Sequence, residues 1–391
     1  MSEEPDAPAW AAPEVYPPKP SGSGYGAMSH KGRETEFDGE EALAAHVQAS
    51  RATVVAVWTP ETERMVPPEA VVDLLEPLRL RFIDTAEANA SDARRNTIIF
   101  ALVVGWSAVA AMQRGIAPYN APTVGFAALL LVVVGLLPWY EAWKEHRSAW
   151  ALNEERLVGE ADEARFDFWL RQQKYPCTIF LIAVMMAGVA GQLFVGLDTA
   201  VPAAGLVKEG GYLAGDWWRL LTGPFLHGHA LHWVLNMLAL WYLGRRVEAL
   251  ARWPHLPMVF LVSMVVGGIA TVALVPARPS IGASGGVLGL LGFLAVFEML
   301  HGRLVPRPAR RRLAAGILLA FVIGFLGYRF VDNAAHAGGL AAGALYALLV
   351  FPRSRSVRRP RITRSDLVTG ILALGVLTAS ALLTGWLLVA S

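Results

Sequence analysis

Cysteine and charged side chains are both scarce in this 391-residue chain. The single cysteine, Cys177, excludes an intramolecular disulfide and any metal site built from several cysteines. Charged residues make up 17% of the chain, whereas soluble domains average about 25%. Apolar residues reach 54%, and the mean hydropathy is +0.42. This balance excludes an ordinary cytosolic enzyme and predicts an all-α polytopic membrane protein in contact with the lipid bilayer.

The signals of two other protein classes are also missing. Lys and Arg total 34 and Asp and Glu total 32, so the net charge of +2 gives no basic field, and we expect no nucleic-acid partner. No basic stretch is followed by an early apolar run. We therefore expect no cleavable signal peptide and a cytoplasmic N-terminus.

The first quarter of the chain has the composition of a tail followed by a small soluble unit. Residues 1–30 are rich in proline and lack apolar periodicity, which predicts a disordered tail. Residues 52–58 predict a buried strand, and 67–82 predict an amphipathic helix kinked at Pro77. We expect a small cytosolic α+β domain over 31–95, with a partner that the sequence does not identify.

Nine apolar runs approach the roughly 20 residues that a membrane-spanning helix needs. They lie at 96–112, 122–140, 177–196, 230–244, 257–275, 284–300, 313–330, 334–351 and 366–390. The prediction is two leading spans (96–140), a charged cytosolic helical linker (141–176), a six-span core (177–351), and a basic loop with a trailing span (352–391).

Arginine is concentrated in alternate loops, which indicates the orientation of the spans. The loops after the fourth, sixth and eighth spans hold Arg245, Arg246, Arg252, Arg303, Arg307, Arg310, Arg311, Arg312, Arg353, Arg355, Arg358, Arg359, Arg361 and Arg364. Cationic loops stay on the cytoplasmic side. This topological role is favoured over contact with anionic lipid or nucleic acid. We expect a multi-pass protein of the bacterial plasma membrane, with its C-terminus outside.

Polar side chains inside predicted spans are candidates for function. They are concentrated in three segments that hold His227, His229, His232 and Asn236; Ser284; and His336. At about 1.5 Å rise per residue, His232, Ser284 and His336 lie at similar depth in the outer half of the bilayer. Similar depth on three helices is what a single site opening to the outer side requires.

Glycines around these residues offer a way to bring the helices together. Gly282, Gly285, Gly286 and Gly289 surround the serine, and Gly339 and Gly343 follow the histidine. Glycines four apart let helix backbones approach closely in lipid. A serine hydroxyl needs a base to act as a nucleophile, so the pattern predicts a dyad of Ser284 and His336. Glu298 and Asp332 are weaker candidates for a third member.

Donors for a developing oxyanion are also present. His232 and Asn236 lie on one helical face, and the Ser284 backbone N–H is a third donor. Each feature has a structural alternative, namely helix packing or interhelical hydrogen bonding. The histidines alone also fit a proton or ion pathway, and the groove alone fits a non-catalytic chaperone that binds helices.

The ordered motifs resemble the rhomboid family of intramembrane serine proteases over about residues 177–351. They are Trp218-Arg219, His227, His232-x-x-x-Asn236, Gly282-Ala283-Ser284-Gly285, and His336-x-x-Gly339-x-x-x-Gly343. The resemblance implies Ser284 as nucleophile, His336 as base, and His232, Asn236 and the Ser284 amide as the oxyanion site. It implies that Trp218 and Arg219 lie in the long loop after the first core span, and that Glu248 is structural.

The resemblance also implies a transmembrane protein as substrate and catalysis without a metal or other cofactor. A gap around the fifth core span, 313–330, is the expected access route, because its glycines at 316, 324 and 327 indicate weak packing. Relatives often carry an aromatic residue four positions after the serine that stacks on the histidine. Here that position is Leu288, and Trp233 or Tyr328 are the candidates to replace the contact.

Overall fold

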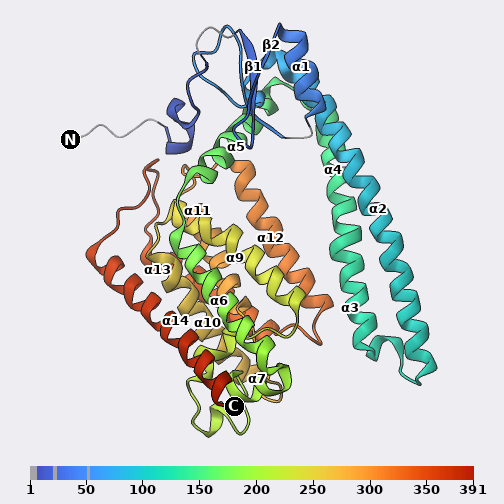
Figure 1. Cartoon of the computed structure of the whole chain (residues 1–391), viewed down its shortest axis with the longest axis vertical. Coiled ribbons are helices and arrows are strands. Elements are labelled where there is room, and N and C mark those ends of the chain that lie inside the picture. The colour runs from blue at the N-terminus through green and yellow to red at the C-terminus, as the bar shows by residue number, and fades with distance from the viewer. Residues whose placement is uncertain (1–6, 21–23, 51–52) are drawn as a thin grey trace.

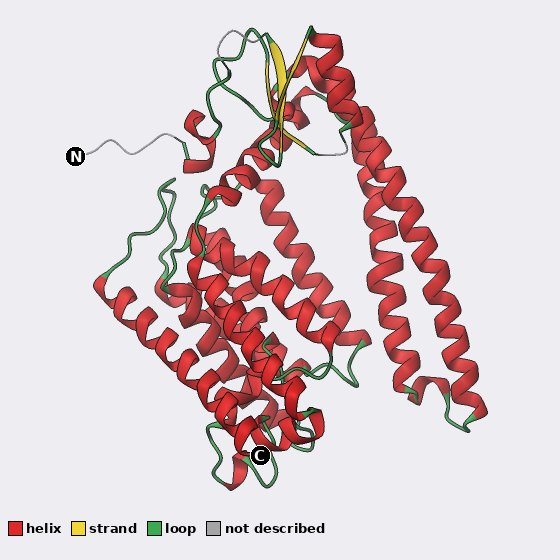
Figure 2. Cartoon of the chain, viewed as in Figure 1, coloured by secondary structure: helices red, strands yellow, loops and turns green. Residues whose placement is uncertain are grey.

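The computed structural model describes residues 7–20, 24–50 and 53–391, and these are mostly helical with one small sheet (Figures 1 and 2). The strands are β1 (Tyr25–Ser29), β2 (Glu34–Phe37) and β3 (Val54–Trp58). The helices are α1 (Glu40–Ala49), α2 (Leu75–Gln113), α3 (Pro122–Leu130), α4 (Leu137–Trp150), α5 (Glu154–Gln172), α6 (Pro176–Val195), α7 (Leu197–Ala204), α8 (Arg219–Thr222), α9 (Ala230–Leu250), α10 (His255–Leu274), α11 (Ser284–Leu300), α12 (Arg307–Leu326), α13 (Asn333–Val350) and α14 (Arg364–Ala390).

A three-stranded antiparallel sheet forms the small α+β unit at the top of Figure 1. The strand order is β2-β1-β3, and α1 covers the sheet with Leu43 and Val47, which are fully buried. The predicted strand over 52–58 corresponds to β3, with residue 52 outside the described part of the chain. The unit begins earlier than expected because β1, its central strand, lies within the first 30 residues.

The prediction of a disordered tail is wrong for residues 7–20 and 24–30. Short 3-10 turns at Ala9–Ala11 and Pro13–Val15 place Trp10 in a buried position. Its indole Nε1 donates to the carbonyl of Leu304 at 2.9 Å, and its ring lies edge-on to Phe166. The proline and glycine content of this segment indicated disorder, but contacts with distant parts of the chain order it.

The predicted helix over 67–82 begins later than expected. Residues Pro68–Ala70 and Val72–Leu74 form 3-10 turns, and α2 starts at Leu75. Pro77 lies in the first turn of α2, where its missing N–H breaks no helical hydrogen bond, so it causes no break. Helix α2 is 39 residues long in total and crosses the expected domain boundary between 95 and 96.

Helix α2 pairs with α3 and α4 to form the leading hairpin, the long pair that stands apart from the bundle in Figure 1. A π-helical stretch, Leu131–Leu136, joins α3 to α4 within one helical rod, which passes through the expected boundary between 140 and 141. Gly135 lies close to Thr97 of α2: a Cβ atom on Gly135 would be 2.8 Å from the hydroxyl oxygen of Thr97. This glycine sets the close approach of the two rods.

Helix α5 joins the soluble unit to the bundle. Arg312 of α12 forms ion pairs with Glu163 and, at 2.9 Å, with Asp167. Burial raises the pKa of Glu163, although Arg312 acts in the opposite direction. The charged linker predicted over 141–176 is therefore a packed element that contacts the fifth helix of the core.

Two charged residues have different roles from those predicted. Arg246 lies inside α9 and is only 1% exposed, not in a loop. Its guanidinium forms a bidentate ion pair with Glu298 at 2.6 and 2.9 Å. Glu298 is thus engaged at the arginine-rich end of α11 and is not a third member of a catalytic group.

Helices occupy all nine predicted span positions among the described residues, including α11 at 284–300. By length and composition, six of the described helices could cross a membrane: 72–113, 122–150, 176–195, 255–274, 333–350 and 364–390. Helix α11 is apolar but only 17 residues long. The chain is thus a multi-pass helical protein, and the finer count of nine rests on the sequence.

Helices α11 and α13 pack backbone to backbone in the centre of the bundle. A Cβ atom on Gly343 would lie 1.9 Å from the carbonyl oxygen of Gly289, and one on Gly339 would lie 2.1 Å from that of Gly285. Only glycine permits such an approach. The predicted glycine face therefore does bring the serine helix and the histidine helix together.

Candidate active site

Ser284 and His336 lie within hydrogen-bonding distance of each other. The Ser284 Oγ atom is 2.7 Å from His336 Nε2. Ser284 is the first residue of α11, and His336 lies in the first turn of α13. Both residues are partly exposed. When His336 carries its proton on Nδ1, its Nε2 atom accepts the hydroxyl proton of Ser284.

The segment before Ser284 is held by the long loop between α6 and α9. Ser280 and Leu206 exchange two backbone hydrogen bonds of 3.0 and 3.1 Å, and the Gly282 N–H donates to the Gly223 carbonyl at 3.1 Å. Gly282 has a φ of +118°, which favours glycine, and it packs against the imidazole of His232. These backbone contacts, which spacing alone does not reveal, fix the start of α11.

His336 is positioned through the N-terminus of its helix. Asp332 is the N-cap of α13 and accepts from the Ala335 N–H at 3.0 Å and from the Ser280 hydroxyl at 2.6 Å. Burial favours a higher pKa for Asp332, but these hydrogen bonds and one from Thr271 outweigh it and lower the pKa. Asp332 therefore links the serine segment to the histidine helix, and its carboxylate makes no hydrogen bond to the imidazole among the described residues.

Four of the predicted residues, three histidines and an asparagine, lie at the start of α9. The rings of His227 and His232 lie 5.1 Å apart in an edge-on arrangement. His229 caps α9 by accepting from the His232 N–H at 3.0 Å. Asn236 is buried, and its Nδ2 donates to the His232 carbonyl at 3.1 Å. His232 reaches the serine segment through its contact with Gly282, whereas Asn236 makes no hydrogen bond to Ser284.

His227 is buried at 1% exposure, and its backbone exchanges hydrogen bonds with the side chain of Gln192. Neither ring nitrogen has a hydrogen-bond partner within the described residues. No group of three or more His, Cys, Asp or Glu side chains in the described ranges could hold a metal ion. The histidine cluster therefore does not form a metal centre in that part of the chain.

Trp218, Arg219 and Glu248 have positions that suit a structural role. Arg219 donates to the carbonyls of Pro202 and Gly205, pairs with Asp216, and stacks on the Trp218 ring. Glu248 accepts from the backbone N–H groups of Cys177 and Thr178 at 3.2 and 2.6 Å, so it caps the start of α6. Through its bonds to the Pro202 and Gly205 carbonyls, Arg219 joins two parts of the long loop that holds the serine segment.

A cavity of about 700 Å³ opens beside His336 along α12. It is lined by Leu288, Ile317, Ala320, Phe321, Gly324, Phe325, Leu326, Tyr328, Asn333, His336, Ala337 and Leu340. Tyr328 lines the same cavity as His336, but no aromatic ring pairs with this imidazole in the described part of the chain. The glycines predicted to indicate weak packing differ from one another: Gly324 lies closely against Asn333, whereas Gly316 has only Leu291 within 4 Å of a Cβ position.

Residues 214–353 match the family model of the rhomboid domain. This stretch of the chain is therefore a rhomboid domain within a multi-pass helical protein. The chain is 35% identical over 137 residues to the rhomboid protease GluP of Bacillus subtilis. The aligned residues make up 35% of this chain and 27% of that protein. The chain is 32% identical to RHOMBOID-like protein 4 of Arabidopsis thaliana, over 34% of this chain and 35% of the relative.

A third relative differs in its stated activity. The human inactive rhomboid protein 2 is 31% identical over 139 residues, which cover 35% of this chain and 16% of that protein. The chain thus spans about a third or less of the length of these curated relatives. The family match begins at residue 214, so the soluble unit and the whole leading hairpin lie before it.

Proposed function

We propose that this rhomboid is an intramembrane serine endopeptidase that cleaves transmembrane segments of other membrane proteins. The observation that carries the proposal is the 2.7 Å contact between Ser284 Oγ and His336 Nε2 on two helices that glycines bring together. A serine with an imidazole in hydrogen-bonding reach is the basic unit of nucleophilic acyl transfer.

His336 carries the proton in both halves of the reaction, the formation of the acyl-enzyme and its hydrolysis. The Ser284 Oγ attacks the peptide carbonyl while His336 Nε2 takes the hydroxyl proton. His336 then donates this proton to the leaving amine, and the peptide bond breaks to give an acyl-enzyme on Ser284. A water molecule attacks the ester as His336 removes its proton, and Ser284 regains a proton when the acid product leaves.

Charge on the substrate carbonyl oxygen is stabilised by donors at the start of α11. The N–H groups of the first turn of a helix have no intrahelical acceptor, and the helix dipole favours negative charge there. Ser284 supplies its own N–H as the first residue of α11. The ring of His232, held against Gly282, and the second amide hydrogen of Asn236 complete the proposed oxyanion site.

The cavity along α12 supports access for the substrate from this side. Its lining is mainly apolar and includes His336, so an unwound stretch of a transmembrane helix that occupies it lies next to the dyad. We further propose that the N-terminus is cytoplasmic and that the site opens to the outer side of a bacterial plasma membrane. The distribution of arginine supports this orientation.

The test is a cleavage assay on the full chain in liposomes with a model transmembrane substrate. Ser284→Ala abolishes cleavage, and His336→Ala lowers the rate by about 10²–10⁴-fold because the general base is lost. Ser380→Ala is the matched control, because Ser380 is a buried serine of α14 that bonds only its own helix. Cleavage that survives Ser284→Ala contradicts the proposal.

A non-catalytic function in helix binding is the second candidate, because one group of relatives carries the name inactive rhomboid protein. In that case the wild-type chain cleaves no substrate. It still captures the transmembrane substrate, and Ser284→Ala leaves this capture unchanged. A proton or ion pathway through the histidines instead predicts flux that depends on His232 and not on Ser284.

A further inference from the structure

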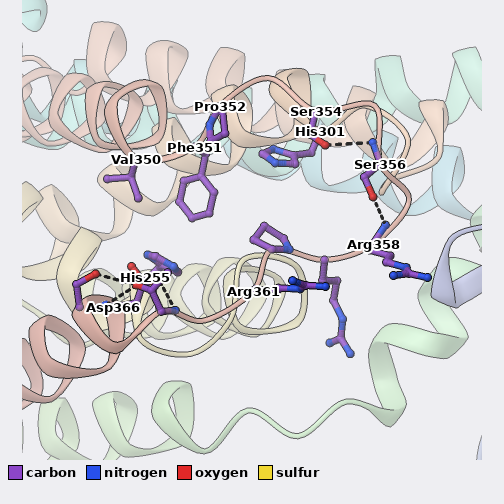
Figure 3. A pocket seen from close by; sticks show the side chains of 14 residues that line it. His255, His301, Val350, Phe351, Pro352, Ser354, Ser356, Arg358, Arg361 and Asp366 are labelled. Atoms are coloured by element: carbon purple, nitrogen blue, oxygen red, sulfur yellow. Dashed lines mark hydrogen bonds between the residues drawn. The ribbon is translucent and has the colours of Figure 1, made fainter. Parts of the chain in front are cut away.

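A second cavity, of about 720 Å³, lies at the arginine-rich end of the bundle. Figure 3 shows the side chains that line it. It is enclosed by the end of α13, the loop 351–363, and the first residues of α10 and α14. Its lining is His255, His301, Val350, Phe351, Pro352, Ser354, Ser356, Arg358, Arg359, Pro360, Arg361, Thr363, Ser365 and Asp366. The role proposed for Ser284 and His336 uses none of these residues.

Hydrogen-bond donors converge on this cavity. Ser354 Oγ accepts from the Ser356 N–H, and Ser356 Oγ accepts from the Arg358 N–H, so each hydroxyl hydrogen is left for another acceptor. His301 is 4% exposed, and its Nδ1 contacts the Phe297 carbonyl at 3.3 Å. A carbonyl only accepts, so Nδ1 is the donor, and Nε2 of the neutral imidazole has no hydrogen to donate. The two serine hydroxyls are therefore the donors that this part of the lining offers to a ligand.

The charges of the lining are mainly positive. Arg358, Arg359 and Arg361 stand against one carboxylate, Asp366. Asp366 is engaged in the capping box of α14, where it accepts from the Thr363 N–H at 2.8 Å. Arg359 donates to the Ala249 carbonyl. The side chain of Arg361 makes no hydrogen bond or ion pair to any described residue, so it is available to a ligand.

The position of the cavity matches the level of lipid head groups. It lies where α11 and α13 end and where α10 and α14 begin, so it is at one rim of the membrane-spanning bundle. Guanidinium and hydroxyl groups bind phosphate oxygens well, and basic pockets between membrane helices accept phosphorylated head groups.

We propose that this cavity is a binding site for a phosphate group, with Arg361, Ser354 and Ser356 as its principal ligands. Two sources carry this chemistry: the phosphodiester of an anionic lipid and free inorganic phosphate. A phosphate held here contacts the loop 351–363 as well as the ends of α11 and α13. It therefore ties α14 to the core.

The experiment measures the Tm of the purified full chain in maltoside micelles, which contain no phosphate. One arm titrates inorganic phosphate, with sodium chloride at equal ionic strength as the reference. The other titrates phosphatidylglycerol, with phosphatidylcholine as the zwitterionic reference. A ligand of the folded state raises the Tm in a saturable way. A rise with phosphate identifies the free ion, and a rise with phosphatidylglycerol alone identifies the lipid.

Arg361→Ala is the test variant, and Arg353→Ala is its matched control. Both arginines are exposed on the same loop, but Arg353 does not line the cavity. Arg361→Ala is expected to weaken the apparent affinity by about tenfold or more, because a charge-assisted hydrogen bond is lost. Arg353→Ala leaves it unchanged. The proposal is overturned if neither arm shifts the Tm, or if the two variants weaken binding equally.

Discussion

Gly282 shows how a single residue sets the geometry of the site. Its positive φ lets the chain turn into α11, and the lack of a side chain leaves room for the ring of His232, which a Cβ atom would approach to 2.6 Å. Two separate constraints, backbone conformation and space, therefore meet at this position. They keep His232 next to the start of the serine helix.

Gly282→Ala should abolish most cleavage activity because it both strains the backbone and displaces His232. Gly215→Ala is the matched control, because Gly215 has a φ of +117° but nothing within 4 Å of its Cβ position. Because alanine is strained at a positive φ, each substitution lowers the free energy of unfolding by about 1–3 kcal/mol, and both variants have a lower Tm. Measured in the same assay, equal activities for the two variants would contradict a role for the His232 contact.

Asn236→Ala tests the proposed oxyanion site. Loss of one preorganised donor lowers kcat by about 10²–10³-fold, with little change in KM, because the donor acts on charge that develops in the transition state. Steady-state kinetics on the transmembrane substrate separate the two constants. A rise in KM at constant kcat would show instead that Asn236 contributes to substrate binding.

The residue types of the site could be predicted from the sequence, but several of their partners could not. Ser284 and His336 were chosen because a polar residue among small apolar ones is unusual in a membrane span. Glu298 was considered for the same reason, yet its partner is Arg246, 52 positions away. Asp332 bonds Ser280 rather than the imidazole. Such pairings depend on tertiary packing, which local spacing does not report.

The pairing of α11 with α13 is the main feature at the scale of elements. Gly339 and Gly343 lie against the backbone of Gly285 and Gly289, so the distance between Ser284 and His336 is set by two helices in direct contact. A polar residue in a membrane span costs free energy in lipid. Close packing of small residues is the main force that holds α11 and α13 together.

Gly343→Ala should separate α11 from α13 and lower both the Tm and the cleavage rate. The new methyl group would lie 1.9 Å from the Gly289 carbonyl oxygen, so one backbone must move. Gly375→Ala in α14 is the control, because nothing lies within 4 Å of that position and alanine favours helix by about 1 kcal/mol. A wild-type Tm and rate for Gly343→Ala would mean that the helices do not pack as described.

Helix positions were predicted better than helix ends and soluble structure. Apolar runs mark the nine positions because lipid demands them. In contrast, α2 extends without a break from the soluble unit to the hairpin tip, since no proline or glycine signal stops it between residues 78 and 104. The strand β1 was missed because its residues, YGAMS, lack the alternation that usually indicates a strand.

At the scale of the whole molecule, segments outside the core contact both ends of α12. At one end, Arg312 pairs with Glu163 and Asp167 of α5. Beyond the other end, Arg329 donates two hydrogen bonds of 2.7 Å to Asn120 of the leading hairpin, and Phe330 lies edge-on to Phe126. Because α12 lines the cavity beside His336, these contacts restrain the wall of the proposed access route.

Arg329→Ala should raise the rate of transmembrane substrate cleavage by up to about tenfold, because release of two charge-assisted hydrogen bonds frees the C-terminal end of α12. Arg114→Ala is the control, since Arg114 is an exposed arginine at the tip of the same hairpin with no ion pair in the described ranges. A cleavage rate that falls, or that both variants change equally, would contradict a restraint at this contact.

The most direct test of the central claim is to map the residue that a fluorophosphonate probe modifies in the purified full chain. Such probes react only with a serine whose hydroxyl is activated by a base. A single adduct is expected on the peptide that contains Ser284. It should be lost in Ser284→Ala, strongly reduced in His336→Ala, and unchanged in Ser380→Ala. No adduct on Ser284, in a chain shown to cleave a transmembrane substrate, would contradict the central claim.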